Sequence, residues 1–198
     1  FIGAQIPYRI VGGLRFFERQ EIKDILAYLR VLHNPLDSVS LRRIMNVPPR
    51  GIGEQTMARL EMTAAERRMS LWEVIGNAAH LDLGTRQTQA AAAFPATMDR
   101  LLDLSRTHSI TPLVEAVLRE TGYEEWLRGE GTVKAQAKLD NVHELMSATR
   151  EFEKEFGIAS QSNAQAGTGN MQQAIPKPPV AAGMAGRNAG LATGNGVE

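Results

Sequence analysis

The segment PPRGIGEQT, residues 48–56, joins two stretches whose apolar residues recur at helical spacing. Pro48 and Pro49 must end the helix before them, because proline lacks an amide donor and clashes with the preceding helical turn. Two glycines around one apolar residue then let the backbone turn tightly, while Ile52 anchors the turn in the core. The sequence therefore predicts two helices joined by a compact turn.

The residues that follow this turn have the features of a phosphate-binding site. Amides in the first turn of a helix lack internal partners, and with the helix dipole they hold a phosphate oxygen at ~0.3–1 kcal/mol per favourable charge. Arg50 adds a positive charge, whereas Glu54 at the same helix start would weaken anion binding. Such a site grips the sugar-phosphate backbone without reading bases, so binding should be independent of sequence and sensitive to salt.

The distribution of charge is consistent with a nucleic-acid contact in this part of the chain. The whole chain has no net charge, but residues 1–70 hold eleven Lys/Arg against seven Asp/Glu, and residues 71–156 hold nine against fourteen. An excess of four positive charges is also ordinary scatter, and Gly-x-Gly between helices is a common turn. From the residues alone, a helix-hairpin-helix DNA-binding module and a helical scaffold for protein partners both remain open.

The rest of the sequence predicts a mainly α fold. Leu29 and Leu32 continue a helical period that begins at Ile22, and similar spacing recurs down the chain. Helices are expected at 18–33, 54–68 and 134–156. A short helix should follow a cap at Asp37 or Ser38, and another should begin at a Ser70–Glu73 capping box. A long helix should begin at Thr85 and be kinked or split at Pro95, and a further helix should run from Thr111-Pro112 to Gly122.

Both ends of the chain are expected to differ from this helical body. Residues 6–11 (IPYRIV) read as one short strand, which must pair with chain that is not present here. Together with a start at Phe1, this indicates a piece of a longer protein. Residues 157–198 are rich in Gly, Ala, Asn and Gln, and we expect them to be a disordered linker or tail.

Composition and motifs exclude several kinds of chemistry. The chain has no cysteine, which rules out disulfides, thiolate-bound metal and a cysteine nucleophile. It has no Gly-x-x-x-x-Gly-Lys-Ser/Thr string for nucleotide phosphates, and its four histidines are scattered. No apolar run approaches the ~20 residues of a membrane helix. The chain by itself is therefore expected to be catalytically inactive, to avoid membranes and to lie in the cytoplasm.

A set of longer motifs resembles one known family. These motifs are IPYRIVGG (6–13), FFERQEIKD (16–24), AYLR (27–30) and NVPPRGIG (46–53), with looser matches at SLW (70–72), TGY (121–123) and LDNVHEL (139–145). In this order and spacing they resemble the UvrD/PcrA/Rep group of superfamily 1 DNA helicases over about residues 1–156. After Gly157 the family would continue through further helices, so this chain departs from the pattern there, through either a long disordered loop or a degenerate reading frame.

The resemblance implies a fragment of an ATP-driven 3′-to-5′ DNA helicase that acts in DNA repair or replication restart. Residues 1–33 would be the edge of a RecA-like motor domain (2A), 34–156 much of helical subdomain 2B, and 157–198 the linker or tail. ATP and Mg²⁺ would bind elsewhere in the parent enzyme, and the other motor domains would be partners. The glycine turn would contact the backbone of duplex DNA through Arg50, Gly51, Ile52, Gly53 and Thr56. Arg30 and Asn34 would lie near the single strand, and the enzyme would associate with the nucleoid. For Arg30 and Asn34, solvation and capping of a helix end is the alternative.

Overall fold

The computed structural model describes residues 15–81 and 83–157, and every regular element in these two ranges is helical. The α-helices and one 3₁₀ turn are α1 (Gln20–His33), α2 (Ser38–Ile44), α3 (Glu54–Arg67), α4 (Leu71–Gly76), η2 (Ala78–His80), α5 (Thr85–Ser105), α6 (Ile110–Thr121), α7 (Tyr123–Glu130) and α8 (Val133–Glu155). The predicted mainly α class is confirmed. The strand expected at 6–11 and nearly all of the expected tail lie outside the described residues.

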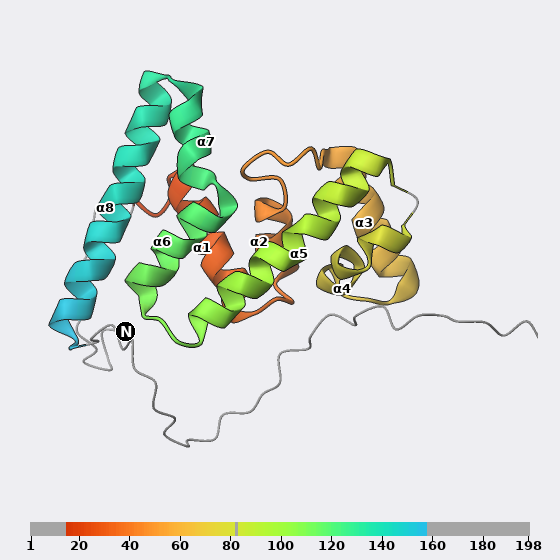
Figure 1. The fold of residues 1–198 in the computed structure, drawn as a ribbon, viewed down its shortest axis with the longest axis horizontal. Coiled ribbons are helices and arrows are strands. Elements are labelled where there is room, and N and C mark those ends of the chain that lie inside the picture. The colour runs from red at the N-terminus through yellow and green to blue at the C-terminus, as the bar shows by residue number, and fades with distance from the viewer. Residues whose placement is uncertain (1–14, 82, 158–198) are drawn as a thin grey trace, which may run out of the picture.

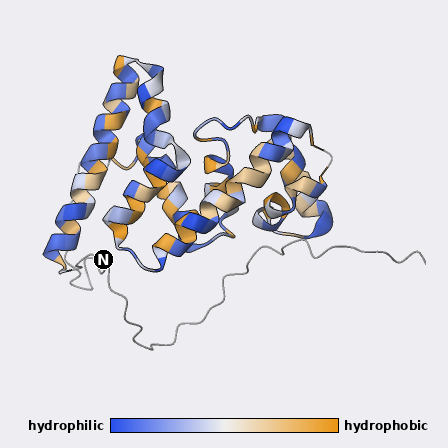
Figure 2. Cartoon of the chain, in the orientation of Figure 1, coloured by the Kyte–Doolittle hydropathy of each residue, from blue (hydrophilic) through white to orange (hydrophobic). Residues whose placement is uncertain are grey.

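Helix α1 is the centre around which the other helices pack. It contacts α2, α5, α6 and α8, and Figure 1 shows it between α6–α8 on one side and α2–α5 on the other. The apolar side chains Ile22, Ile25 and Val31 are fully buried. Figure 2 shows apolar positions gathered where helices face each other and hydrophilic positions on the outer sides. Burial of these apolar faces therefore holds the two groups of helices together.

Several predicted helix ends are confirmed with their capping interactions. The Asp37 carboxylate accepts a hydrogen bond from the Ser40 amide at 3.0 Å and so caps α2. Ser70 and Glu73 form a reciprocal capping box at the start of α4. Gly122 ends α6 in the left-handed conformation with φ 71°. In each case, local side-chain chemistry visible in the sequence fixes the helix boundary.

Two expectations about helix boundaries are wrong. The split expected as one possibility at Pro95 does not occur, because α5 continues through Pro95, where Phe94 and Met98 are buried on either side and tertiary packing offsets the hydrogen bond that proline cannot make. α6 begins at Ile110 after Ser109, ahead of the expected cap at Thr111. Proline is tolerated here because the first-turn amides of a helix have no intrahelical acceptor.

The last long helix and the one before it also differ from expectation. α7 was not singled out from the sequence, because it is only eight residues long and lies between the left-handed glycines Gly122 and Gly131. On α8, which the sequence predicts at 134–156, Leu139 and Val142 are buried, whereas Phe152 and the C-cap residue Phe156 are 49% and 42% exposed. Their rings pack against each other with centroids 4.5 Å apart.

No helix in the two described ranges has the length and apolar character needed to cross a bilayer.

Candidate nucleic-acid interface

The turn between α2 and α3 is held from inside by one core residue and one amide side chain. Ile52 is 1% exposed, as the sequence predicts for an anchor. Asn46 uses its Oδ1 atom to accept hydrogen bonds from the backbone amides of Arg50, at 2.7 Å, and Ile52, at 3.2 Å. Gly51 has a φ of +82°, a conformation that side chains rarely adopt. The turn is therefore compact, and two of its amides point inward.

The Arg50 side chain also points into the protein. Its Nη1 donates to the backbone oxygens of Ile44, Met45 and Pro48 at 2.9, 3.3 and 3.2 Å, and its Nη2 donates to the Tyr28 hydroxyl at 2.6 Å. Its guanidinium carbon lies 5.4 Å from the centre of the Phe94 ring on α5. The sequence places a free cation here, whereas the structure gives its terminal nitrogens four internal acceptors.

The start of α3 is open. Gly53 is the N-cap, with a φ of −77°, and no side chain caps the helix. The amides of residues 54–56 therefore begin the helix without an acceptor from the described part of the chain. Gly51 and Gly53 are exposed and Thr56 is half-buried. These are the geometric conditions for holding an anion with backbone amides.

A second arginine lies beside this helix start. A Cβ atom placed on Gly51 would lie 3.4 Å from Nε of Arg86, the second residue of α5. Arg86 is exposed. Its positive charge therefore lies against the outer side of the turn, where the sequence analysis expects Arg50.

The two arginines of α2 are also engaged within the protein. Arg42 pairs with both Glu54 and Glu61 of α3. Arg43 donates from Nε to Asp24 at 2.8 Å and from Nη2 to the Gln20 carbonyl at 3.2 Å. Because Arg42 holds Glu54, the negative charge at the α3 start is partly compensated. The charge excess of the N-terminal region is therefore less available to an external anion than the sequence suggests.

Asp24 lies at a buried junction of three helices. Besides Arg43, its carboxylate accepts a hydrogen bond from the Tyr123 hydroxyl of α7 at 2.9 Å. Burial raises the pKa of Asp24, against the lowering effect of the hydrogen bonds from Tyr123 and Arg43. This junction fixes α1 to α2 and α7 and so supports the helix that carries Tyr28.

The two residues expected near a single strand lie together at the end of α1. Arg30 and Asn34 are exposed, and the Asn34 amide donates to the Arg30 carbonyl at 2.7 Å. The Asn34 side chain accepts a hydrogen bond from the Leu36 amide at 3.1 Å. These local bonds agree with the capping role stated as the alternative, and they leave the Arg30 guanidinium at the surface.

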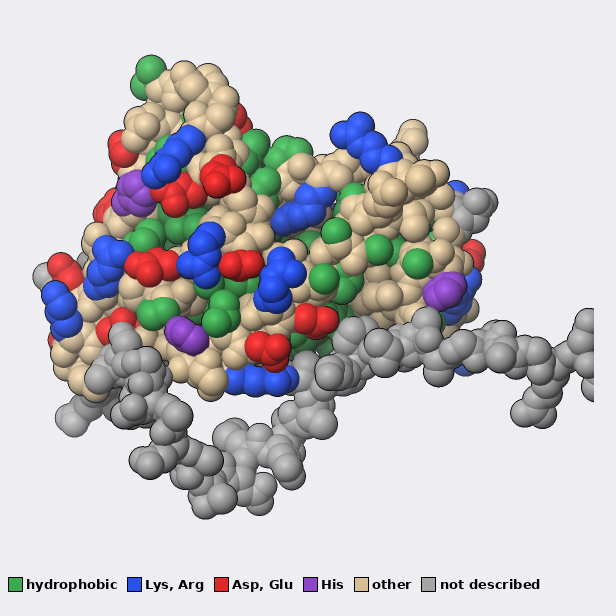
Figure 3. Space-filling model, in the orientation of Figure 1, with side chains coloured by type: hydrophobic (Ala, Val, Ile, Leu, Met, Phe, Trp, Pro, Cys, Tyr) green, Lys and Arg blue, Asp and Glu red, His purple; other side chains and the backbone are tan. Residues whose placement is uncertain are grey.

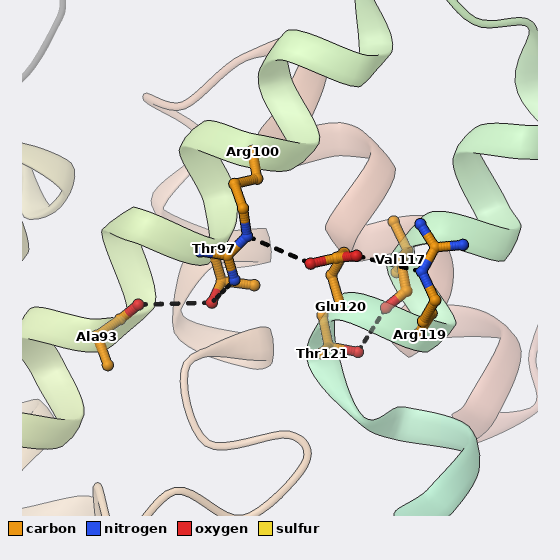
Figure 4. Close-up of polar contacts among 7 residues, drawn as sticks. All are labelled: Ala93, Thr97, Arg100, Val117, Arg119, Glu120 and Thr121. Atoms are coloured by element: carbon orange, nitrogen blue, oxygen red, sulfur yellow. Dashed lines mark hydrogen bonds and ion pairs between the residues drawn. The ribbon is translucent and has the colours of Figure 1, made fainter.

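Around α6, basic side chains are paired with acidic ones. Figure 3 shows Lys/Arg and Asp/Glu side chains next to one another in the half of the molecule that carries α6–α8. Figure 4 shows Glu120 of α6 between Arg119 and Arg100, each at 3.2 Å. The hydrogen bonds from Arg119 and Arg100 lower the pKa of Glu120. Paired charges of this kind offer little to a phosphate, in contrast to Arg86.

The described residues do not fit a metal or nucleotide site. They contain no group of three or more His, Asp or Glu side chains that could hold a metal ion. The full sequence has no phosphate-binding glycine-lysine loop.

Three residues of the site were missed from the sequence. Asn46 had a usable signal, because asparagine side chains commonly bond backbone amides in nearby turns. Tyr28 reads as one more core position of an amphipathic helix. Arg86 lies 35 positions after Gly51, and only the packing of α5 against the turn brings the two together.

Comparison with known proteins gives the family. The UvrD-like helicase C-terminal domain matches residues 1–166. The chain is 34% identical over 162 residues to the ATP-dependent DNA helicase PcrA of Staphylococcus aureus (strain Mu50 / ATCC 700699), which covers 82% of this chain and 22% of that protein. The PcrA helicase of Staphylococcus epidermidis (strain ATCC 12228 / FDA PCI 1200) is 33% identical over the same shares of the two chains. The chain thus spans 22% of the length of these relatives, and it belongs to the UvrD-like helicase C-terminal domain family.

Proposed function

We propose that this chain is the DNA-gripping part of an ATP-dependent 3′-to-5′ DNA helicase. In this proposal residues 1–33 belong to the edge of motor domain 2A, 34–156 to subdomain 2B, and 157–198 to a linker or tail. The chain binds duplex DNA through its phosphates and regulates the motor, and it does not hydrolyse ATP. ATP and Mg²⁺ bind in other parts of the parent enzyme, and its remaining motor domains are the partners of this chain. When bound to DNA, the enzyme associates with the nucleoid.

The observation that carries the proposal is the open start of α3. Its first-turn amides have no cap, Gly51 and Gly53 remove side chains from the approach, and the Arg86 guanidinium lies against Gly51. A phosphate oxygen is a suitable acceptor for such amides, and a nearby arginine adds a charge-assisted bond. The proposed duplex contacts are Gly51, Gly53 and Thr56. Arg50 and Ile52 belong to the site by holding the turn, because the Arg50 guanidinium is bonded inside the protein and Ile52 is buried with its amide bonded to Asn46.

The single-strand contact is proposed at Arg30 and Asn34. Both side chains are exposed at the end of α1, immediately before the segment that leads to the turn. Single-stranded DNA that passes this end of α1 would contact the positive charge of Arg30 and the side-chain amide of Asn34. The family match, which covers residues on both sides of the turn, favours a helicase part over a free-standing helix-hairpin-helix module.

Titration of the full chain with labelled duplex DNA at ~50 mM salt tests the proposal, because phosphate contacts are strongest at low salt. Fluorescence anisotropy with two duplexes of unrelated sequence should give equal affinities that fall as salt is raised. No binding at this salt concentration, or a strong preference for one sequence, would contradict the proposal.

A further inference from the structure

The side chains around the turn form a connected set that faces away from the proposed DNA contact. We infer that Tyr28 and Arg50, together with Asn46, form a lock that fixes the glycine turn against α1 and so positions the open α3 start, an inference that rests on the proposed function. These three are positioning residues, which act on the DNA contact through the backbone of the turn.

Tyr28 is the fixed point of the lock. It is fully buried on α1, and its hydroxyl donates to the Val47 carbonyl at 2.5 Å while accepting from Arg50 at 2.6 Å. One hydroxyl therefore ties two positions of the turn to the central helix. Burial raises the pKa of Tyr28, which keeps the donating hydrogen in place over the physiological range. Phenylalanine would fill the same space without either bond.

Arg50 closes the end of α2. The last carbonyls of a helix have no intrahelical partner, and the Arg50 guanidinium donates to those of Ile44 and Met45 as well as to Pro48. The Ile44 carbonyl also accepts from the Val47 amide at 3.1 Å, so the Met45 and Pro48 carbonyls depend most on Arg50. A swing of this side chain toward a phosphate would break these bonds and the bond to Tyr28. Leaving partly buried acceptors without donors is costly, so the charge stays inside.

Asn46 divides the amides of the turn into two sets. Those of Arg50 and Ile52 are held inward by its Oδ1 atom, whereas those that begin α3, from residue 54 onward, have no cap. With the first set fixed inward, the second set is held ready for an external acceptor. Preorganised donors bind more tightly because less order is lost on binding.

The variants Tyr28→Phe and Arg50→Gln separate positioning from direct contact. Tyr28→Phe changes no charge, and we expect it to weaken duplex binding by roughly tenfold, the equivalent of about one lost hydrogen bond. The slope of log affinity against log salt should stay at the wild-type value. Arg50→Gln should also weaken binding with an unchanged slope, whereas loss of a phosphate ligand would reduce the slope by about 0.9.

Tyr123→Phe is the matched control. It removes another buried tyrosine hydroxyl, the one that donates to Asp24 at 2.9 Å on the α7 side of α1. We expect its duplex affinity to stay within about twofold of wild type. Amide hydrogen exchange, followed by NMR on the full chain without DNA, gives a second readout. Exchange at Arg50 and Ile52 should accelerate in Tyr28→Phe and stay unchanged in Tyr123→Phe.

Each outcome has one meaning for the lock. Wild-type affinity in a folded Tyr28→Phe variant overturns it, and so does a loss of about one unit of salt slope in Arg50→Gln. Unchanged exchange at Arg50 and Ile52 in Tyr28→Phe overturns the geometric part directly. If the wild-type chain binds no duplex DNA, the proposed function fails and the positioning role fails with it, even where exchange responds as expected.

Discussion

The starts of α3 and α6 differ in what lies against their first-turn amides, which have no acceptor within the helix. Neither N-cap residue, Gly53 or Ser109, provides a side-chain cap. At α6 the chain provides its own anion from a distant helix, because Glu153 of α8 accepts a hydrogen bond from the Thr111 amide at 2.9 Å. At α3 no side chain of residues 15–81 and 83–157 caps the first turn, and Arg86 lies beside Gly51 instead. An internal carboxylate therefore closes the start of α6, whereas the start of α3 carries no side-chain cap from the described residues.

The start of α6 is also tied to α8 by a second hydrogen bond. The Thr111 hydroxyl donates to the Thr149 hydroxyl at 2.9 Å. Burial acts to raise the pKa of Glu153, but hydrogen bonds from the Thr111 amide and neighbouring groups outweigh it, and the pKa lies below its usual value. The negative charge at α6 is therefore part of the fold, whereas the α3 start depends on core packing and the Tyr28–Arg50 lock.

The largest expected effect tests that dependence on packing. Ile52→Ala should lower the free energy of unfolding by about 3 kcal/mol, because a fully buried side chain is lost and a cavity remains. Val39→Ala on α2 is the control, since Val39 is 79% exposed and should change stability by less than ~0.5 kcal/mol. Urea unfolding followed by circular dichroism measures both. Equal effects for the two variants would show that the turn is not anchored through Ile52.

Alanine at the two glycines tests the backbone of the open start. Gly51→Ala should cost about 1–2 kcal/mol, because a φ of +82° places Cβ against the backbone. Gly53→Ala should cost less, since its φ of −77° suits alanine and no atom lies within 4 Å of the added Cβ. The same unfolding assay gives both values. A larger loss at Gly53 than at Gly51 would contradict the described turn.

Glu153→Gln tests whether the charge of Glu153 stabilises the start of α6. Glutamine keeps the shape but not the charge, so at pH 7 the variant should be less stable by about 1 kcal/mol. Because the folded-state pKa of Glu153 is lowered, its charge stabilises the fold above the unfolded pKa of about 4.3, and this stabilisation is lost as pH falls through the folded value. The difference in unfolding free energy between variant and wild type should therefore shrink as pH falls below about 4.3. A difference that stays constant from pH 7 down to pH 3 would mean that the charge of Glu153 does not matter.

Much of the fold could be predicted because its signals are local. The helical period around Ile22, the cap at Asp37 and the Ser70–Glu73 box each depend on residues a few positions apart, and each is confirmed. The unbroken course of α5 through Pro95 was not predictable in this way, because packing from other helices decides it.

The candidate site was predictable only in its backbone. The glycine pattern identified the turn and its buried Ile52, and the open helix start follows from it. The side chains did not follow, because which arginine faces solvent depends on contacts between distant elements. Tyr28, 22 positions before Arg50, draws that side chain inward, and α5 brings Arg86 to the outside.

The salt dependence of duplex binding in Arg86→Gln is the most direct test of the central claim, that phosphates bind at the open start of α3. Arg119→Gln is the control, because Arg119 is already paired with Glu120 on α6. Plots of log affinity against log salt, measured by anisotropy on the full chain, should lose about 0.9 in slope for Arg86→Gln and nothing for Arg119→Gln. Equal slopes for wild type and Arg86→Gln, or an equal loss in both variants, would contradict a DNA contact at this helix start.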